Sequence, residues 1–103
     1  MATFRGGSPT PSLVSGSPVV TQMPGTQPVE CGPVATKPQG LAFYMLGVTD
    51  SASGTTNGFV QLSDQAGNPS GYFSPTTGQS VSTMTTDNNI VGGWTCMTFA
   101  LAP

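Results

Sequence analysis

The stretch Trp94-Thr95-Cys96-Met97-Thr98-Phe99-Ala100-Leu101 decides the fold class of this chain. Neighbouring side chains of a β-strand point to opposite sides. Met97, Phe99 and Leu101 therefore share one face of the stretch, and its remaining apolar residues share the other. Apolar residues on both faces are typical of a strand that is buried on both sides. The stretch therefore predicts an interior β-strand.

Residues 41–103 contain further strand signals. Leu41–Thr49 is an apolar run that is too short for a typical helix and lies between Gly40 and Asp50. Shorter strands are predicted at 59–62, from residue 72 and at 80–86. The intervening turns carry Asn57-Gly58, the strongest short hairpin signal, or polar clusters such as 64–71 and Asp87–Asn89. This spacing predicts a mainly β domain, a small antiparallel barrel or sandwich. Its expected core is Phe43, Met45, Leu46, Phe59, Leu62, Phe73, Met97, Phe99 and Leu101.

Residues 1–40 are predicted to form a separate N-terminal arm that is extended and rich in Pro, Thr and Gly. Seven of the ten prolines fall in this segment, a density that excludes helix and disfavours an interior strand. Short apolar clusters interrupt the arm, and a free linker would not need them. We therefore predict that these residues bind a partner: Leu13, Val14, Val19, Val20, Met23 and Val29.

Charge excludes several classes of partner. The chain has two cations and four carboxylates, a net charge of −2, so it cannot neutralise a row of phosphates or anchor to an anionic membrane. No window approaches 18 apolar residues. The first residues also lack the apolar segment of a secretory signal, which predicts synthesis in a cytoplasm. Nucleic acid and membrane are therefore not expected partners.

Cys31 and Cys96 are separated by 65 positions. In a reducing compartment the expected state is two buried, reduced thiols that pack as small apolar side chains. A disulfide that ties the arm to the last strand is the alternative.

The ionisable residues do not predict an enzyme. The chain has no histidine, which removes the commonest general base and the commonest metal ligand. Asp50, Asp64 and Asp87 each stand in a turn context, where the side chain ordinarily bonds the local backbone. We predict no catalytic residue, no metal site and no cofactor.

The relative size of the arm and the body favours a role in a larger assembly. A 63-residue body has a radius of gyration of about 11 Å. An extended 40-residue arm reaches up to about 120 Å. Such an arm either wraps its own domain or lies across neighbouring subunits, where extended backbone can add to a sheet edge.

The layout resembles the small virion proteins of tailed bacteriophages, and among them capsid decoration (cement) proteins. The resemblance rests on arm residues 1–40, the scarcity of charge, and a β body, residues 41–103, that ends in a Trp-containing strand. It implies a structural protein of the virion that stabilises the capsid, with the major capsid protein or another virion protein as its partner. It also implies homo-oligomers, often trimers, with the arm clamping adjacent coat subunits.

Two alternatives remain open at the level of sequence. The first is a host-recognition module of a tail or head fibre, which would need Tyr44, Tyr72 or Trp94 exposed to solvent. The second is a β interaction module of a cell surface, which the missing export signal disfavours.

Overall fold

The computed structural model of this chain describes residues 12–23, 29–48, 51–63, 68–85, 87–89 and 93–103. Every regular element within those ranges is a strand, so the mainly β fold predicted from the sequence is confirmed. In chain order the strands are β1 (Val19–Met23), β2 (Glu30–Ala35), β3 (Leu41–Val48), β4 (Ser51–Ser53), β5 (Val60–Ser63), β6 (Ser70–Phe73), β7 (Ser80–Met84), β8 (Asp87–Asn89) and β9 (Trp94–Leu101).

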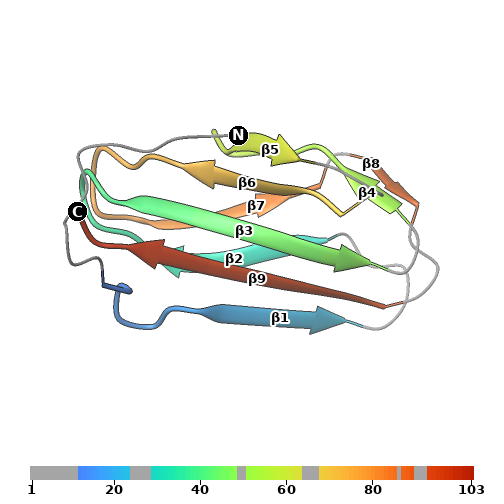
Figure 1. The fold of residues 1–103 in the computed structure, drawn as a ribbon, viewed down its shortest axis with the longest axis horizontal. Coiled ribbons are helices and arrows are strands. Elements are labelled where there is room, and N and C mark those ends of the chain that lie inside the picture. The colour runs from blue at the N-terminus through green and yellow to red at the C-terminus, as the bar shows by residue number, and fades with distance from the viewer. Residues whose placement is uncertain (1–11, 24–28, 49–50, 64–67, 86, 90–92) are drawn as a thin grey trace.

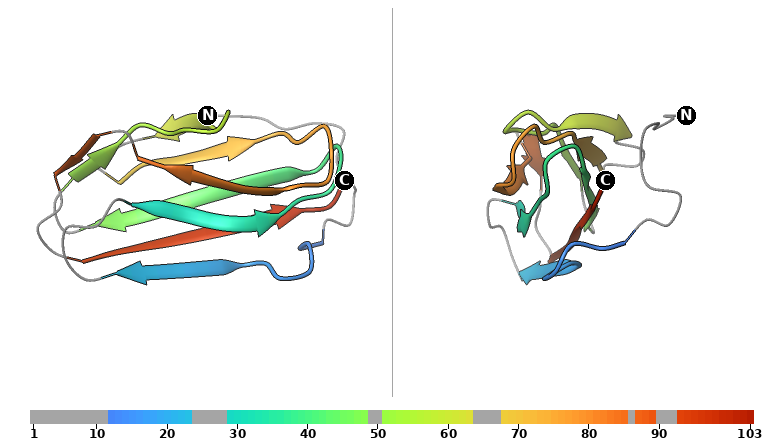
Figure 2. Two further views of the ribbon diagram at one scale, coloured as in Figure 1. Left: turned by 180° about the vertical axis from the view of Figure 1, so that it is seen from behind. Right: turned by 90° about the vertical axis from the view of Figure 1, so that its left-hand side faces the viewer.

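The strands are arranged as a sandwich rather than a closed barrel. Five of them form an antiparallel sheet in the order β1-β9-β3-β6-β5, and β2 pairs with β7 in a second sheet. Figure 1 looks onto the five-stranded sheet with β2 and β7 behind it. In the view from behind, on the left of Figure 2, β2 and β7 lie in front of the large sheet. The third pair, β4 and β8, lies at one end of the molecule (Figure 1).

Strand β9 is covered on one face only, so the prediction that it is buried on both sides is wrong. It lies between β1 and β3 in the large sheet. Its burial alternates, with Trp94, Cys96, Thr98 and Ala100 turned inward. The other face of β9 is exposed or partly exposed, because the strands of the described residues form no third layer there.

The core therefore differs from the one expected. Of the nine predicted core residues, Leu46 and Phe59 are buried, and Phe73 packs against the core from a partly exposed position. Leu62 is exposed on β5, and the other five lie on the uncovered face of β3 and β9. The physical reason is that these strands are apolar on both faces, so alternation alone does not tell which face the second sheet covers. The buried apolar cluster is Val14, Val29, Cys31, Val34, Ala42, Tyr44, Leu46, Ala52, Phe59, Val81, Trp94, Cys96 and Ala100.

Residues 12–23 and 29–40 belong to this sandwich, which corrects the expectation of a separate arm over residues 1–40. β1 pairs with β9 along its whole length, and β2 pairs with β7. Upstream of β1, the Val14 amide donates to the Ala100 carbonyl at 2.8 Å. The remainder of the predicted arm, residues 1–11 and 24–28, lies outside the described residues.

The prolines of this segment stand where a sandwich tolerates them. Pro18 directly precedes β1, which is an edge strand of the large sheet. Pro33 lies within β2 where the pairing with β7 shifts register between Cys31 and Val34. Proline removes a backbone donor, so edge strands and bulges are the places in a sheet that accept it. Proline density therefore excluded helix correctly but did not exclude strands.

The turn predictions had mixed outcomes. Asn57 and Gly58 both have positive φ, 60° and 81°, as the predicted Asn-Gly turn requires. Asp87–Asn89 was predicted as a turn but forms β8, which pairs with β4 in a segment predicted as loop. Asp50 and residues 64–67 of the predicted turn 64–71 lie outside the described residues, whereas Ser70 and Gly71 of that predicted turn belong to β6.

Candidate functional site: the outer face of the five-stranded sheet

The uncovered side of the five-stranded sheet, which we call the outer face, carries a continuous set of apolar side chains. Alternation along each strand and the pairing between strands place these residues on one side. The face is turned toward the viewer in Figure 1 and away from β2 and β7. Its apolar members are Leu13, Val20, Leu41, Phe43, Met45, Val60, Tyr72, Met97, Phe99 and Leu101.

Two neighbouring rows form the centre of the outer face. Phe43 and Phe99 are direct partners across β3 and β9, and their rings stack with centroids 5.1 Å apart and an interplanar angle of 19°. The next row pairs Met45 with Met97, whose side chains are 51% and 38% exposed. A rigid aromatic pair thus lies beside two flexible thioethers, and both rows reach solvent.

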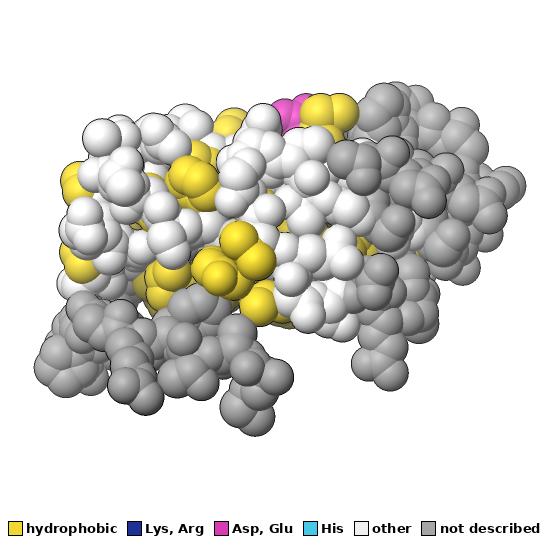
Figure 3. All heavy atoms as spheres, turned by 90° about the horizontal axis from the view of Figure 1, so that it is seen from above, with side chains coloured by type: hydrophobic (Ala, Val, Ile, Leu, Met, Phe, Trp, Pro, Cys, Tyr) yellow, Lys and Arg dark blue, Asp and Glu magenta, His cyan; other side chains and the backbone are white. Residues whose placement is uncertain are grey.

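Within the described part of the chain, the outer face carries no charged side chain. The five strands of the large sheet contain no Asp, Glu, Lys or Arg, whereas exposed Glu30 and Lys37 lie in and just after β2 of the other sheet. Figure 3 looks down onto the β5 edge and shows apolar side chains reaching the surface with little charged colour among the coloured atoms. Burial against another apolar surface would therefore leave no charge unpaired.

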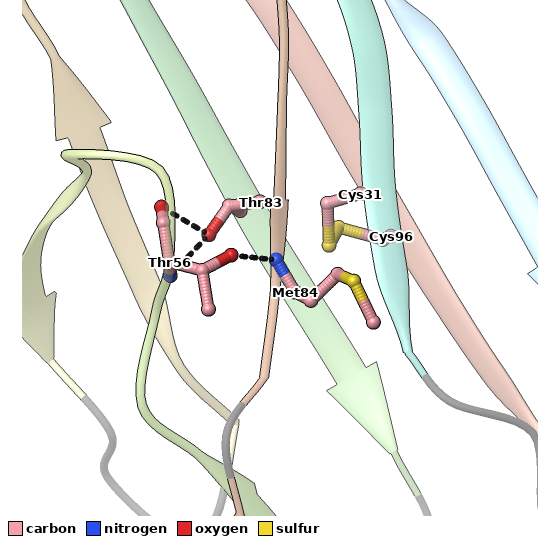
Figure 4. The surroundings of a disulfide bond; sticks show 5 residues. All are labelled: Cys31, Thr56, Thr83, Met84 and Cys96. Atoms are coloured by element: carbon pink, nitrogen blue, oxygen red, sulfur yellow. Dashed lines mark hydrogen bonds between the residues drawn. A yellow bond between two sulfur atoms is a disulfide. The ribbon is translucent and has the colours of Figure 1, made fainter.

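A disulfide joins the two sheets through the core. Cys31 of β2 and Cys96 of β9 are bonded, with Cα atoms 5.6 Å apart and both residues buried (Figure 4). The expectation of two reduced thiols is therefore wrong, although both are buried as predicted. The prediction of reduced thiols rested on a reducing compartment, and the alternative, a disulfide from Cys31 to the last strand, is the arrangement in the structure.

A side-chain network closes the edge of β7 that faces away from β2. The Thr83 hydroxyl donates to the Thr56 carbonyl at 3.1 Å and accepts from the Thr56 amide at 3.0 Å (Figure 4). The Met84 amide donates to the Thr56 hydroxyl at 2.9 Å, and the Asn57 amide group donates to the Ser82 carbonyl at 2.8 Å. These bonds occupy backbone groups that a partner strand would otherwise use.

The structure divides the six predicted partner-binding residues between core and surface. Val14 and Val29 are buried in the chain's own core, and Val19 packs against it, so these three do not serve a partner. Leu13 and Val20 are exposed and belong to the outer face. Met23 lies opposite Trp94 in β1, and its side chain is outside the described set.

The aromatic residues proposed for host recognition are mostly interior. Tyr44 is 1% exposed and Trp94 4% exposed, and Tyr44 packs edge-on against Phe59 with centroids 5.7 Å apart. Tyr72 is partly exposed and lies on the outer face, where it pairs with Phe43 across β3 and β6. Sequence reasoning assigned Phe43, Met45, Met97 and Phe99 to the core, because their strands are apolar on both faces and alternation does not show which face is covered.

The described residues contain no group of three or more His, Cys, Asp or Glu placed to hold a metal ion. Nor do they include any helix with the length and apolar character needed to cross a membrane. Comparison with family models, with curated proteins and with solved structures finds no match to this chain.

Proposed function

We propose that this chain is a structural protein that buries the outer face of its five-stranded sheet against protein in a larger assembly. The observation that carries the proposal is the uncharged, apolar outer face, with Phe43, Met45, Met97 and Phe99 at its centre. Contiguous exposed apolar patches are uncommon on monomeric proteins and mark sites of interaction. Methionines and aromatic residues are also enriched at the cores of protein interfaces.

The disulfide supports an oxidising location for this assembly. Disulfides persist in secreted proteins, in the periplasm and on virion or cell surfaces, and they are rare in cytosolic proteins. A buried bond that joins β2 to β9 fits a protein that works outside a cytoplasm. The disulfide therefore favours an oxidising place of action, while synthesis in a cytoplasm stays a prediction.

In its narrower form the proposal places the chain on the capsid of a tailed phage as a decoration protein. The support is the resemblance in layout, the scarcity of charge and a disulfide of the kind that virion surfaces preserve. The major capsid protein or a second virion protein is the proposed partner. An arm spanning residues 1–40 does not serve this attachment, since residues 12–23 and 29–40 are part of the sandwich.

The test uses particles isolated by density gradient from the source of the chain and particles assembled without it. Purified chain should rebind the deficient particles and raise the temperature at which they lose their contents. Met45→Glu should abolish rebinding, because a charge would be buried in an apolar contact without a partner. The matched control is Met84→Glu, since Met84 is 38% exposed on β7 of the other sheet, and this variant should rebind normally. Absence of the chain from all particle fractions would contradict the proposal.

A second candidate, a host-recognition module, is favoured by the aromatic part of the outer face. Phe43, Phe99 and Tyr72 lie side by side there and are partly exposed. The same deficient particles separate the two functions. If the chain is a decoration protein, particles that lack it adsorb to host cells normally but are less stable. If it is a recognition module, particles that lack it are equally stable but adsorb poorly.

A further inference from the structure

We infer that the outer face is the contact between two copies of this chain, related by a two-fold axis. The inference rests on the proposed function, in which this face is buried in an assembly, and names the occupant of the face. The two five-stranded sheets would pack front to front, each keeping its own β2–β7 layer on the far side.

The outline of the molecule leaves room for such a contact. The molecule extends 41 × 27 × 21 Å, and Figure 1 looks down the shortest axis onto the outer face, which therefore lies within an outline of 41 × 27 Å. A stable interface needs about 800 Å² of surface from each partner. The apolar residues reach across all five strands, from Leu13 and Val20 at the β1 edge to Val60 on β5.

Two identical faces meet without repulsion in this case. A two-fold contact brings each patch against a copy of itself, so any charge in the patch meets the same charge nearby. Like charges across an interface are a common means of excluding wrong partners. The five strands of the large sheet contain none, and the exposed Glu30 and Lys37 belong to or follow β2 on the far layer.

The two central rows are complementary to each other. Alternate residues of a strand are about 7 Å apart, so the row of Met45 and Met97 lies one such step from the stacked row of Phe43 and Phe99. A two-fold axis that runs between the rows, across the strands, places the methionine row of one copy over the phenyl row of the other. Facing sheets are about 10 Å apart, which suits interdigitated side chains. Thioether sulfur packs favourably against aromatic rings.

The experiment measures the mass of the purified, disulfide-bonded chain by sedimentation velocity. The intact chain should be a dimer at micromolar concentration. Met97→Glu should weaken dimerisation by about a hundredfold or more, because the two-fold axis buries two unpaired carboxylates at once. Met84→Glu is the control, since Met84 and Met97 are both 38% exposed and lie on opposite sheets, and this variant should remain dimeric. Val20→Glu, at a position 54% exposed on the same face, gives a second variant in case the first fails to fold.

A second measurement tests the arrangement itself. Copies labelled at the methionine methyl groups are mixed with unlabelled copies, and intermolecular NOEs are recorded between those methyl groups and phenyl protons. Contacts from Met45 or Met97 to Phe43 or Phe99 of the other copy are expected. An intact chain that is monomeric at millimolar concentration, or a Met97→Glu variant that dimerises like the intact chain, overturns the inference.

These outcomes are separable from those of the proposed function. A monomeric chain that still binds particles through Met45 overturns the dimer and leaves the structural role standing. A dimer that is absent from every particle fraction supports the two-fold contact and contradicts the structural role.

Discussion

At the scale of single residues, Gly71 shows how closely the large sheet is packed. An added Cβ at this position of β6 would lie 2.5 Å from the Val60 carbonyl oxygen and 2.7 Å from Cε1 of the Tyr44 ring. Backbone on one side and a buried ring on the other leave no direction in which the methyl group can be accommodated. Glycine at position 71 is therefore required by space rather than by backbone conformation.

We expect Gly71→Ala to lower the free energy of unfolding by about 1–3 kcal/mol, the usual cost of overpacking. Gly47→Ala on β3 is the matched control, since its added Cβ would meet only the Thr95 carbonyl oxygen at 3.9 Å. The control should be neutral or should stabilise by up to about 1 kcal/mol through the unfolded state. Urea unfolding measures both variants, and equal midpoints for the two would contradict the packing described here.

At the scale of elements, two buried threonines on different strands have opposite surroundings. Thr83 of β7 makes two hydrogen bonds with the backbone of Thr56, and these hold the 54–58 turn against the strand edge. The Thr98 hydroxyl of β9 is buried and has no hydrogen-bond partner among the described residues. The same substitution should therefore have different effects at the two positions.

Thr83→Val should cost about 1–3 kcal/mol, because it leaves the part-buried amide and carbonyl of Thr56 without their partner. Thr98→Val should be neutral or stabilising, since it replaces a buried polar group by a methyl group of similar size. Hydrogen exchange gives a second readout, in which the Thr56 amide exchanges faster in the first variant only. Equal destabilisation of both variants would show that Thr98 has a partner.

The elements also show what the sequence could predict. The long strands β3 and β9 were found because their apolar runs are continuous, and the turn at Asn57-Gly58 because its residue types demand positive φ. β1 and β2 were missed because proline density was interpreted as disfavouring interior strands, although edges and bulges tolerate proline. β4 and β8 contain Ser, Asn and Asp, which carry no strand signal of their own.

The candidate site was predictable in composition but not in position. Met97, Phe99 and their neighbours were recognised as apolar residues that share one face of a strand, and they were assigned to the core. The side that β2 and β7 cover depends on tertiary contacts between Cys31, Val34 and the inner face of β9, and strand alternation carries no information on that choice.

At the scale of the whole molecule, residues 12–23 and 29–40 are part of the folding unit. Removing residues 1–40 would expose the β9 edge, uncover the inner face of the large sheet and leave Cys96 without its partner. We therefore expect the 41–103 fragment to show no cooperative thermal transition by circular dichroism. A shorter deletion of residues 1–11, which keeps every described strand, is the control and should unfold cooperatively. A cooperatively folded 41–103 fragment would restore the two-part organisation.

The disulfide should contribute a large share of the stability. Closing a loop of 65 residues is worth about 4 kcal/mol by chain entropy, and net stabilities of small domains are only about 5–15 kcal/mol. The double variant Cys31→Ala/Cys96→Ala should lose about that amount in urea unfolding. Adding reductant should lower the midpoint of the intact chain but not that of the double variant. Identical midpoints for intact and substituted chains would contradict this expectation.

The same bond gives the molecule an unusual response to mechanical load. If the chain is stretched between its two ends, tension can lengthen only the segments outside the covalent ring, residues 1–30 and 97–103. At about 3.5 Å per residue these segments reach about 130 Å, against about 360 Å for the whole chain. The ring between Cys31 and Cys96, which holds β3 to β8, therefore cannot be unravelled by a pull at the termini, so the chain would lengthen by a limited distance and then hold.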